Sequence, residues 1–154
     1  MAAKQSSSEP ISDRELITSR TIDASPDRVV AAILDPAQLA RWWGPNGFTN
    51  TFEEFQPRAG GKWRFVMHGP DGKDYPNDSV FVDVTPPDRV IIRHVSHPHF
   101  ELTITLEDVQ GKTRIRWRQR FESAAECQRI AKFAIDANEQ NLDRLTEVVI
   151  GRRD

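Results

Sequence analysis

Cysteine, long apolar runs and an excess of charge of one sign are all scarce in this sequence. One cysteine, Cys127, among 154 residues excludes an internal disulfide and a metal site built from several cysteines. No apolar run approaches the roughly 18 residues that a membrane span requires, so we expect no span. A net charge of -2 disfavours nucleic acid as a partner. Phosphate-loop, dinucleotide-binding and nucleophile-elbow motifs are absent, and we expect no cofactor.

The N-terminal segment is polar and rich in serine. It lacks the apolar stretch of a secretory signal, which predicts a cytoplasmic protein. We expect residues 1–12 to form a flexible tail and residues 13–151 to form one domain, because a chain of this length supplies one hydrophobic core. Apolar aromatic side chains are plentiful, with 4 Trp and 8 Phe against 1 Tyr. The location of these aromatic side chains is therefore the main question that the composition raises.

Turn residues divide the domain into short segments with strand or helix patterns. Ser25-Pro26-Asp27 joins a capping serine, a proline suited to the first helical position and an acid at the positive helix end. The separators between strands are short, which predicts antiparallel pairing. Helices are expected over residues 26–34, 36–42 and 124–150. Strands are expected over residues 15–23, 48–55, 62–68, 80–85, 90–96, 100–109 and 112–122.

Gln110-Gly111 is typical of a two-residue hairpin turn, and this turn sets the pairing of its strands. One face of the hairpin is then charged or hydroxylic and the other is mostly apolar, so the sheet has one dry face. The long C-terminal helix is the predicted element large enough to cover it. The polar pairs are Glu107 with Arg114, Thr105 with Arg116, Thr103 with Arg118 and Glu101 with Arg120; the inner pairs are Leu106 with Ile115, Ile104 with Trp117, Leu102 with Gln119 and Phe100 with Phe121.

A four-residue turn over residues 86–89 predicts a second hairpin. It places Asp83 opposite Ile92 and Phe81 opposite His94. In this register Asp83 and His94 point inward and Arg93 points outward. A carboxylate and an imidazole would then share the interior of the sheet.

Six short motifs in a fixed order resemble a known family. They look like the family related to the C-terminal domain of the activator of the ninety-kilodalton heat-shock-protein ATPase, within the START-like (SRPBCC) helix-grip superfamily. The resemblance covers about residues 14–149. The motifs are Ser25-Pro26-Asp27-Arg28-Val29, Arg41-Trp42-Trp43-Gly44-Pro45, Gly60-Gly61-Lys62-Trp63-Arg64-Phe65, His68-Gly69-Pro70-Asp71-Gly72, Pro86-Pro87-Asp88-Arg89-Val90 and Asn141-Leu142-Asp143-Arg144-Leu145.

The resemblance agrees with the fold that the pattern predicts. Both give an α+β helix-grip fold: a curved antiparallel seven-stranded sheet wrapped around a long C-terminal helix, with two short helices after the first strand. The resemblance also implies an internal pocket for a small hydrophobic or amphipathic molecule. His94 stands where such proteins often carry an aromatic residue, and Ala137-Asn138 stands where they often carry a Gly-Trp-like pair. Both departures predict a more polar pocket.

We therefore expect a small-molecule-binding protein with its ligand between the sheet and the long helix. Trp42 is expected near the mouth, and a few polar groups orient the ligand within apolar walls. The alternative for the aromatic cluster is plain core packing. The expected ligand-binding residues are Trp42, Trp63, Phe65, Phe81, Asp83, His94, Trp117, Gln119, Phe133, Ala137 and Asn141.

Two further functions stay open. Asp83 and His94 suit a pocket acid–base enzyme of the cyclase or dehydratase type. The family resemblance also implies a co-chaperone-like protein-interaction module with a chaperone as partner. His97 and His99 have no nearby carboxylate or thiol in the sequence to complete a metal site, so no metal is expected.

Overall fold

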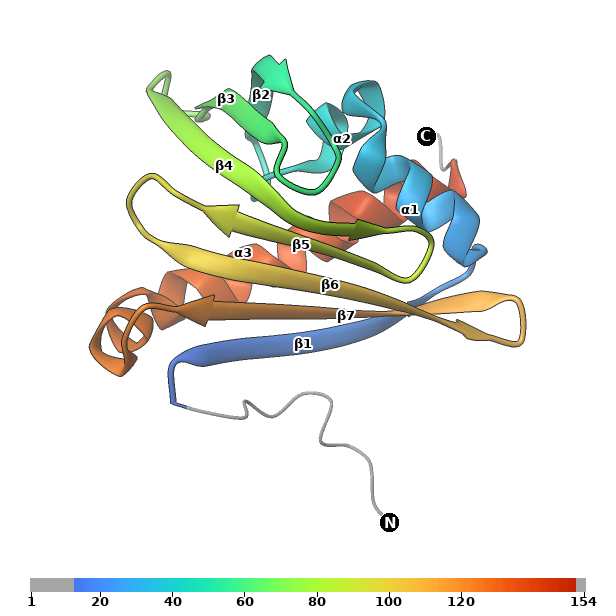
Figure 1. Ribbon diagram of the computed structural model, residues 1–154. Helices are drawn as coiled ribbons and strands as arrows, with labels where there is room; N and C mark the ends of the chain where they lie inside the picture. Colours follow the sequence, from blue (N-terminus) through green and yellow to red (C-terminus); the bar gives the residue numbers. More distant parts are fainter. Residues whose placement is uncertain (1–12, 152–154) are drawn as a thin grey trace.

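A curved antiparallel sheet forms the frame of the protein in the computed structural model, which describes residues 13–151 (Figure 1). Within this stretch the sheet has seven strands in the order β1-β7-β6-β5-β4-β3-β2, so β1 and β2 are its edges. The helix-grip prediction is confirmed. The elements are β1 (Glu15–Ile22), α1 (Pro26–Leu34), α2 (Pro36–Trp42), β2 (Thr49–Phe55), β3 (Lys62–His68), β4 (Asp74–Thr85), β5 (Arg89–His94), β6 (Phe100–Val109), β7 (Lys112–Phe121) and α3 (Ala124–Ile150).

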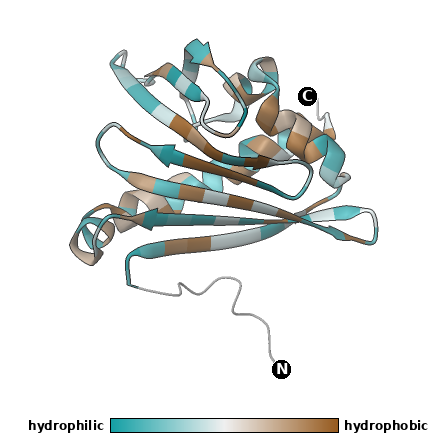
Figure 2. Cartoon of the chain, viewed as in Figure 1, coloured by the Kyte–Doolittle hydropathy of each residue, from teal (hydrophilic) through white to brown (hydrophobic). Residues whose placement is uncertain are grey.

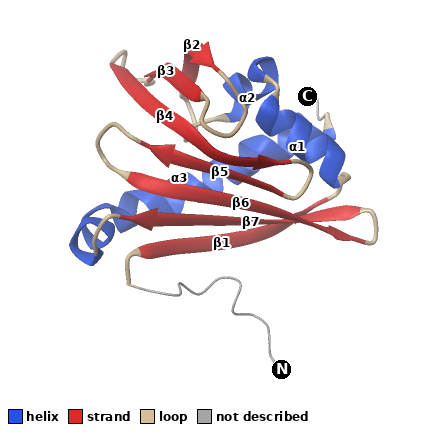
Figure 3. Ribbon diagram, in the orientation of Figure 1, coloured by secondary structure: helices blue, strands red, loops and turns tan. Residues whose placement is uncertain are grey.

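All three helices lie on one side of the sheet (Figure 3). The long helix α3 crosses the inner face and contacts β1, β7, α1 and α2. Serine caps begin two helices. Ser25 Oγ accepts from Arg28 N at 3.3 Å, as expected, and Ser123 Oγ accepts from Glu126 N at 3.1 Å. Of the helices between residues 13 and 151, none is long and apolar enough to cross a membrane. The tail predicted over residues 1–12 lies outside the described residues.

The β6–β7 hairpin has the predicted register in all eight pairs. Gln110 and Gly111 both have positive φ, 56° and 86°, as a two-residue turn that follows the twist of the strands requires. The inner face of this hairpin is buried at Ile104, Ile115 and Trp117. The turn therefore decides which side chains of the hairpin enter the core.

The predicted register of β4 and β5 is wrong. Thr85 pairs with Arg89, so the turn has three residues and not four, and Asp83 pairs with Ile91. An irregularity between Phe81 and Asp83 then adds a residue to β4, so Phe81 pairs with Ile92. An extra residue turns the following side chains to the opposite face. Asp83 consequently points outward, while His94 is buried as predicted.

Strand β4 also begins six residues earlier than expected, at Asp74. Its first half pairs with β3, where Val66 lies opposite Pro76, but β5 pairs only from Ser79 onward. Proline is tolerated there because this part of the strand has no β5 partner to receive an N–H bond. The sequence of this segment is polar and contains a proline, so it does not predict a strand. In the structure this segment pairs with β3 alone.

The core is a layer of aromatic rings between the sheet and the helices, within the apolar central strands seen in Figure 2. Trp63 is its centre: its ring lies 4.3 Å from that of Phe65 and 5.0 Å from that of Trp43 between centroids. Trp63 has no exposed surface. The fully buried aromatic residues are Trp42, Trp63, Phe65, Phe81, Trp117 and Phe121.

Candidate functional site

A cavity of about 210 Å³ lies between α3 and the inner face of the sheet. We call it the chamber. Its walls are mainly aromatic and aliphatic, and its polar groups are amides and one imidazole. Among the described residues that line it, none is Asp, Glu, Lys or Arg. The lining residues are Trp43, Gly44, Pro45, Met67, Asn77, His94, Pro98, Phe100, Gln119, Phe121, Ile130, Phe133, Ala134, Ala137, Asn138 and Asn141.

A second hollow of about 500 Å³ adjoins the chamber, and we call it the mouth groove. The two share Pro45, Met67, Asn77, Pro98 and Phe133, so the groove leads into the chamber. Phe133 of α3 is 66% exposed there and Tyr75 of β4 is 41% exposed, both unusually open for large apolar rings. The remaining lining residues are Phe48, Asp74, Pro76 and His97.

The structure brings five of the predicted site residues together in the chamber. They are His94, Gln119, Phe133, Ala137 and Asn141. The five predicted aromatic wall residues lie in the core layer instead and do not line the chamber; Trp42 Nε1, for example, donates to Ala32 O at 2.9 Å. These core residues are Trp42, Trp63, Phe65, Phe81 and Trp117.

Asp83 is outside the chamber altogether. Its Oδ2 accepts from Arg89 Nε at 2.5 Å, and its Oδ1 accepts from Thr85 Oγ1 at 2.9 Å. The bonds from Arg89 and Thr85 lower the pKa of Asp83. The hypothesis of an Asp83–His94 acid–base pair is wrong, because the two side chains lie on opposite faces of the sheet.

Sequence reasoning missed several lining residues, and two of them had a usable signal. Asn138 lies three residues before Asn141, so both share one face of α3. Trp43 directly follows α2, and its ring contacts both Trp63 and Trp117 while also lining the chamber. Trp43 thus separates the chamber from the aromatic core.

The loop between α2 and β2 carries Trp43 and forms one side of the chamber. Asn141 Oδ1 accepts from Gly44 N at 2.8 Å, and Gln140 Oε1 accepts from Asn46 N at 2.9 Å. Gly44 has φ of +102°, and a Cβ at this position would lie 2.8 Å from Met67 Cε. Both the conformation and the close approach favour glycine here.

Three buried amides line the chamber, Gln119 of β7 and Asn138 and Asn141 of α3. Asn138 Nδ2 donates to Gln119 Oε1 at 3.0 Å, and Asn141 Oδ1 is engaged by the backbone of Gly44. Gln119 Nε2, Asn141 Nδ2 and Asn138 Oδ1 have no hydrogen-bond partner within residues 13–151. These groups are available to a bound molecule.

His94 contributes a ring face to the chamber wall. Its imidazole stacks on Phe100 with centroids 4.6 Å apart. Nδ1 lies 2.7 Å from Pro98 O, and Nε2 lies 2.5 Å from Asn77 Oδ1, while Asn77 Nδ2 donates to Tyr75 O at 2.7 Å. Two oxygen partners suit the charged ring, but burial opposes them and lowers the pKa of His94 overall. Both ring nitrogens therefore already have protein partners.

We expect folding stability to fall on acidification below about pH 6.5 because of His94. The unfolded imidazole keeps its ordinary pKa near 6.5. In the folded protein burial lowers the pKa of His94; the backbone of Pro98 and Ser96 and the charge of Asp78 oppose this shift, and His99 adds to it. The unfolded state therefore binds the proton first as pH falls, and stability is lost down to the folded pKa. Melting temperatures of wild type and His94→Phe between pH 7.5 and 5 test this. The difference in melting temperature between the two proteins removes the contribution that the other histidines make to both. A difference that does not change with pH contradicts the prediction.

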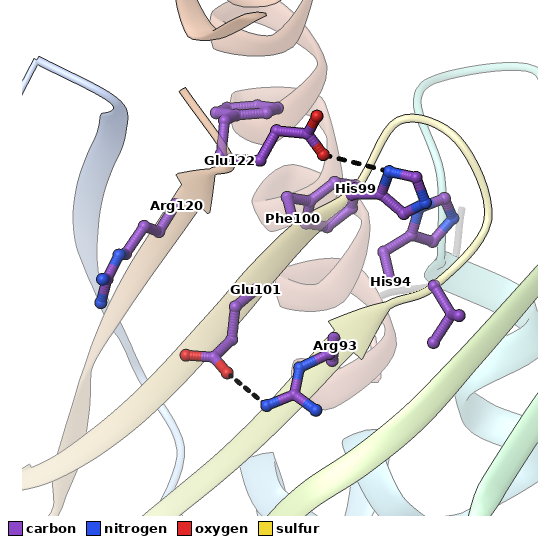
Figure 4. Close-up of a pocket in the computed structure, with 9 residues that line it drawn as sticks. Arg93, His94, His99, Phe100, Glu101, Arg120 and Glu122 are labelled. Carbon is purple, nitrogen blue, oxygen red and sulfur yellow. Dashed lines mark hydrogen bonds and ion pairs between the residues drawn. The ribbon is translucent and has the colours of Figure 1, made fainter. Parts of the chain in front are cut away.

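A third hollow, of about 490 Å³, lies at the ends of β5, β6 and β7 and opens broadly to solvent (Figure 4). Two ion pairs lie in its lining: Arg93 Nη2 is 3.4 Å from Glu101 Oε2, and His99 Nδ1 is 3.1 Å from Glu122 Oε1. Across the described stretch, no three His, Cys, Asp or Glu side chains gather as a metal site. The chamber is therefore the better candidate for a binding site.

Solved structures of several bacterial proteins share this fold. A protein from Arthrobacter aurescens is 26% identical with a TM-score of 0.85, the match covering 92% of this chain and 89% of that chain. A Rhodobacter sphaeroides protein is 25% identical with a TM-score of 0.82, covering 94% and 97%. A Nitrosomonas europaea protein shares the fold at 19% identity and a TM-score of 0.84, covering 91% and 96%. No curated protein matches the chain.

Residues 23–149 match the family described as Activator of Hsp90 ATPase homolog 1-like protein. This match spans most of the chain and includes the segments that build the chamber, from the α2–β2 loop to the end of α3. The chain therefore belongs to the Activator of Hsp90 ATPase homolog 1-like family, within the START-like helix-grip superfamily.

Proposed function

We propose that the protein binds a small hydrophobic or amphipathic molecule in the chamber, with part of the molecule in the mouth groove. The observation that carries this proposal is an apolar chamber that has free amide groups in its lining and adjoins an open groove. An apolar cavity of about 150 Å³ is large enough for benzene. The chamber of about 210 Å³ is thus large enough for one substituted ring, and the groove accommodates a longer molecule.

The lining favours binding over acid–base chemistry. Ligand pockets are mainly apolar, with a few polar groups that fix orientation. Proton transfer needs a group within hydrogen-bond reach of the substrate, yet both nitrogens of His94 already have protein partners. Asp83, the expected second group of a cyclase or dehydratase, is on the far face of the sheet.

Filling the chamber is expected to abolish binding. Ala137 lies on the helix wall of the chamber and is partly buried, so Ala137→Phe places a ring where the ligand would lie. We expect at least a tenfold loss of affinity for the neutral probe N-phenyl-1-naphthylamine, measured by its fluorescence. Folding is checked by circular dichroism and thermal unfolding.

Ala125→Phe is the matched control. Ala125 is exposed in the first turn of α3, is not part of the chamber lining, and receives the same added ring. This variant should bind the probe like wild type. Equal affinity of Ala137→Phe and Ala125→Phe would show that the probe binds elsewhere and would overturn the proposal.

A further inference from the structure

The chamber combines an absence of formal charge with an excess of free N–H donors. We infer that its ligand is an uncharged ring compound with a carbonyl oxygen at the free amide donors and an apolar extension toward the mouth groove. This inference rests on the proposed function, since it names the chemical class of the molecule bound at the same site. It follows from three properties of the lining.

Charge is the first property. No Asp, Glu, Lys or Arg lines the chamber among the described residues. Arg144, one turn beyond Asn141 on α3, directs its guanidinium to backbone carbonyls of the α2–β2 loop. A carboxylate or an ammonium group in the chamber would lose its hydration without gaining a counter-ion, which is strongly unfavourable. An uncharged ligand avoids this loss.

Hydrogen-bonding capacity is the second property. Gln119 Nε2 and Asn141 Nδ2 are amide NH₂ groups without a protein partner in the described stretch, and each is a double donor. Asn138 Oδ1 is the one free acceptor of the three amides. Donors therefore outnumber acceptors, and a ligand acceptor oxygen complements them. A carbonyl oxygen has two lone pairs for this purpose and carries no charge.

Shape is the third property. The rings of Phe100 and Phe121 lie 5.8 Å apart, and His94 stacks on the first of them. With Trp43 they form an aromatic lining that suits a planar ring. The exposed rings of Phe133 and Tyr75 continue this apolar surface into the mouth groove. A ring with an apolar substituent extends along this path.

Three probes of similar size separate these properties: acetophenone has a carbonyl, ethylbenzene lacks an acceptor, and benzoate is an anion. Binding is measured by calorimetry with the whole chain, and amide NMR shifts locate the probe. We expect acetophenone to bind about 3- to 10-fold more tightly than ethylbenzene, the effect of one neutral hydrogen bond. Benzoate is expected to bind most weakly at neutral pH.

The double variant Gln119→Met/Asn138→Leu removes the free Gln119 donor at similar side-chain size and does not leave Asn138 Nδ2 as a new free donor. We expect it to reduce the advantage of acetophenone over ethylbenzene by about 3-fold or more and to leave ethylbenzene binding unchanged. If this double variant does not fold, the ranking of the three probes with wild type decides alone. Benzoate binding as tightly as acetophenone, or ethylbenzene doing so, overturns the inference while the proposed function stands. Failure of all three probes and of N-phenyl-1-naphthylamine to bind in the chamber overturns both.

Discussion

Replacing Trp63 by alanine is expected to lower the free energy of unfolding by about 3–5 kcal/mol, the usual cost of removing a large ring from a packed core. Trp63 is completely buried and packs against Phe65, Phe81 and Trp43. With Phe52 and Phe55 of β2, the surrounding rings come from three strands and one loop, so they cannot all close the gap. Urea unfolding followed by circular dichroism measures the change.

Phe133→Ala is the matched control for this prediction. Phe133 is 66% exposed on α3 at the mouth groove, so its loss should change the free energy of unfolding by less than about 0.5 kcal/mol. It should nevertheless weaken binding of N-phenyl-1-naphthylamine several-fold. The opposite pattern, with a stable Trp63→Ala that has lost binding, would place Trp63 in the ligand wall as the sequence first suggested.

The sheet could be predicted from sequence where a turn fixes the pairing. Gln110-Gly111 has the composition of a two-residue hairpin turn, and its positive φ angles give the eight expected pairs of β6 and β7. The alternation of polar and apolar residues then assigns Ile104 and Trp117 to the dry face. The residues of the turn and the alternation of polar and apolar residues along both strands indicate the same pairing, which is why the prediction succeeds.

The β4–β5 hairpin shows where this reasoning ends. Its turn has three residues and not the four that we expected, because Thr85 pairs with Arg89. The irregularity between Phe81 and Asp83 is a further two-against-one pairing that alternation does not reveal. One extra residue is enough to move Asp83 from the interior to the exterior, where Arg89 binds it. A predicted catalytic pair thus depended on a single residue of register.

The helix side of the site was more predictable than the sheet side. Phe133, Ala137 and Asn141 are spaced four residues apart, and this spacing places them on one face of α3. On the sheet, Trp63 and Gln119 both point inward, yet only Gln119 reaches the chamber. Which inward-pointing residues reach the chamber depends on the curvature of the sheet and on the position of Trp43 in the α2–β2 loop. Neither can be read from the alternation of polar and apolar residues in the sequence.

The side chain of Arg144 makes five hydrogen bonds to backbone carbonyls beside the chamber. Its guanidinium donates to the backbone carbonyls of Arg41, Gly44, Pro45 and Phe48 at 2.7–2.9 Å and of Trp43 at 3.3 Å. These carbonyls belong to the last turn of α2 and to the loop after it, where free carbonyl oxygens accumulate partial negative charge. Burial lowers the pKa of Arg144, but the group stays charged at neutral pH.

Arg144→Ala is therefore expected to lower the free energy of unfolding by about 2–4 kcal/mol, because it leaves several partly buried carbonyls without their charged donor. Arg144→Lys keeps the charge but not the planar fork, so it should recover less than half of this loss. Because the same loop holds Trp43 and Gly44 at the chamber, both variants should also weaken binding of N-phenyl-1-naphthylamine. Chemical unfolding and probe titration of the two variants, read beside the Ala125→Phe control, measure both effects. A lysine variant that matches wild type in both would mean that charge alone, without the five directed bonds, holds the α2–β2 loop against α3.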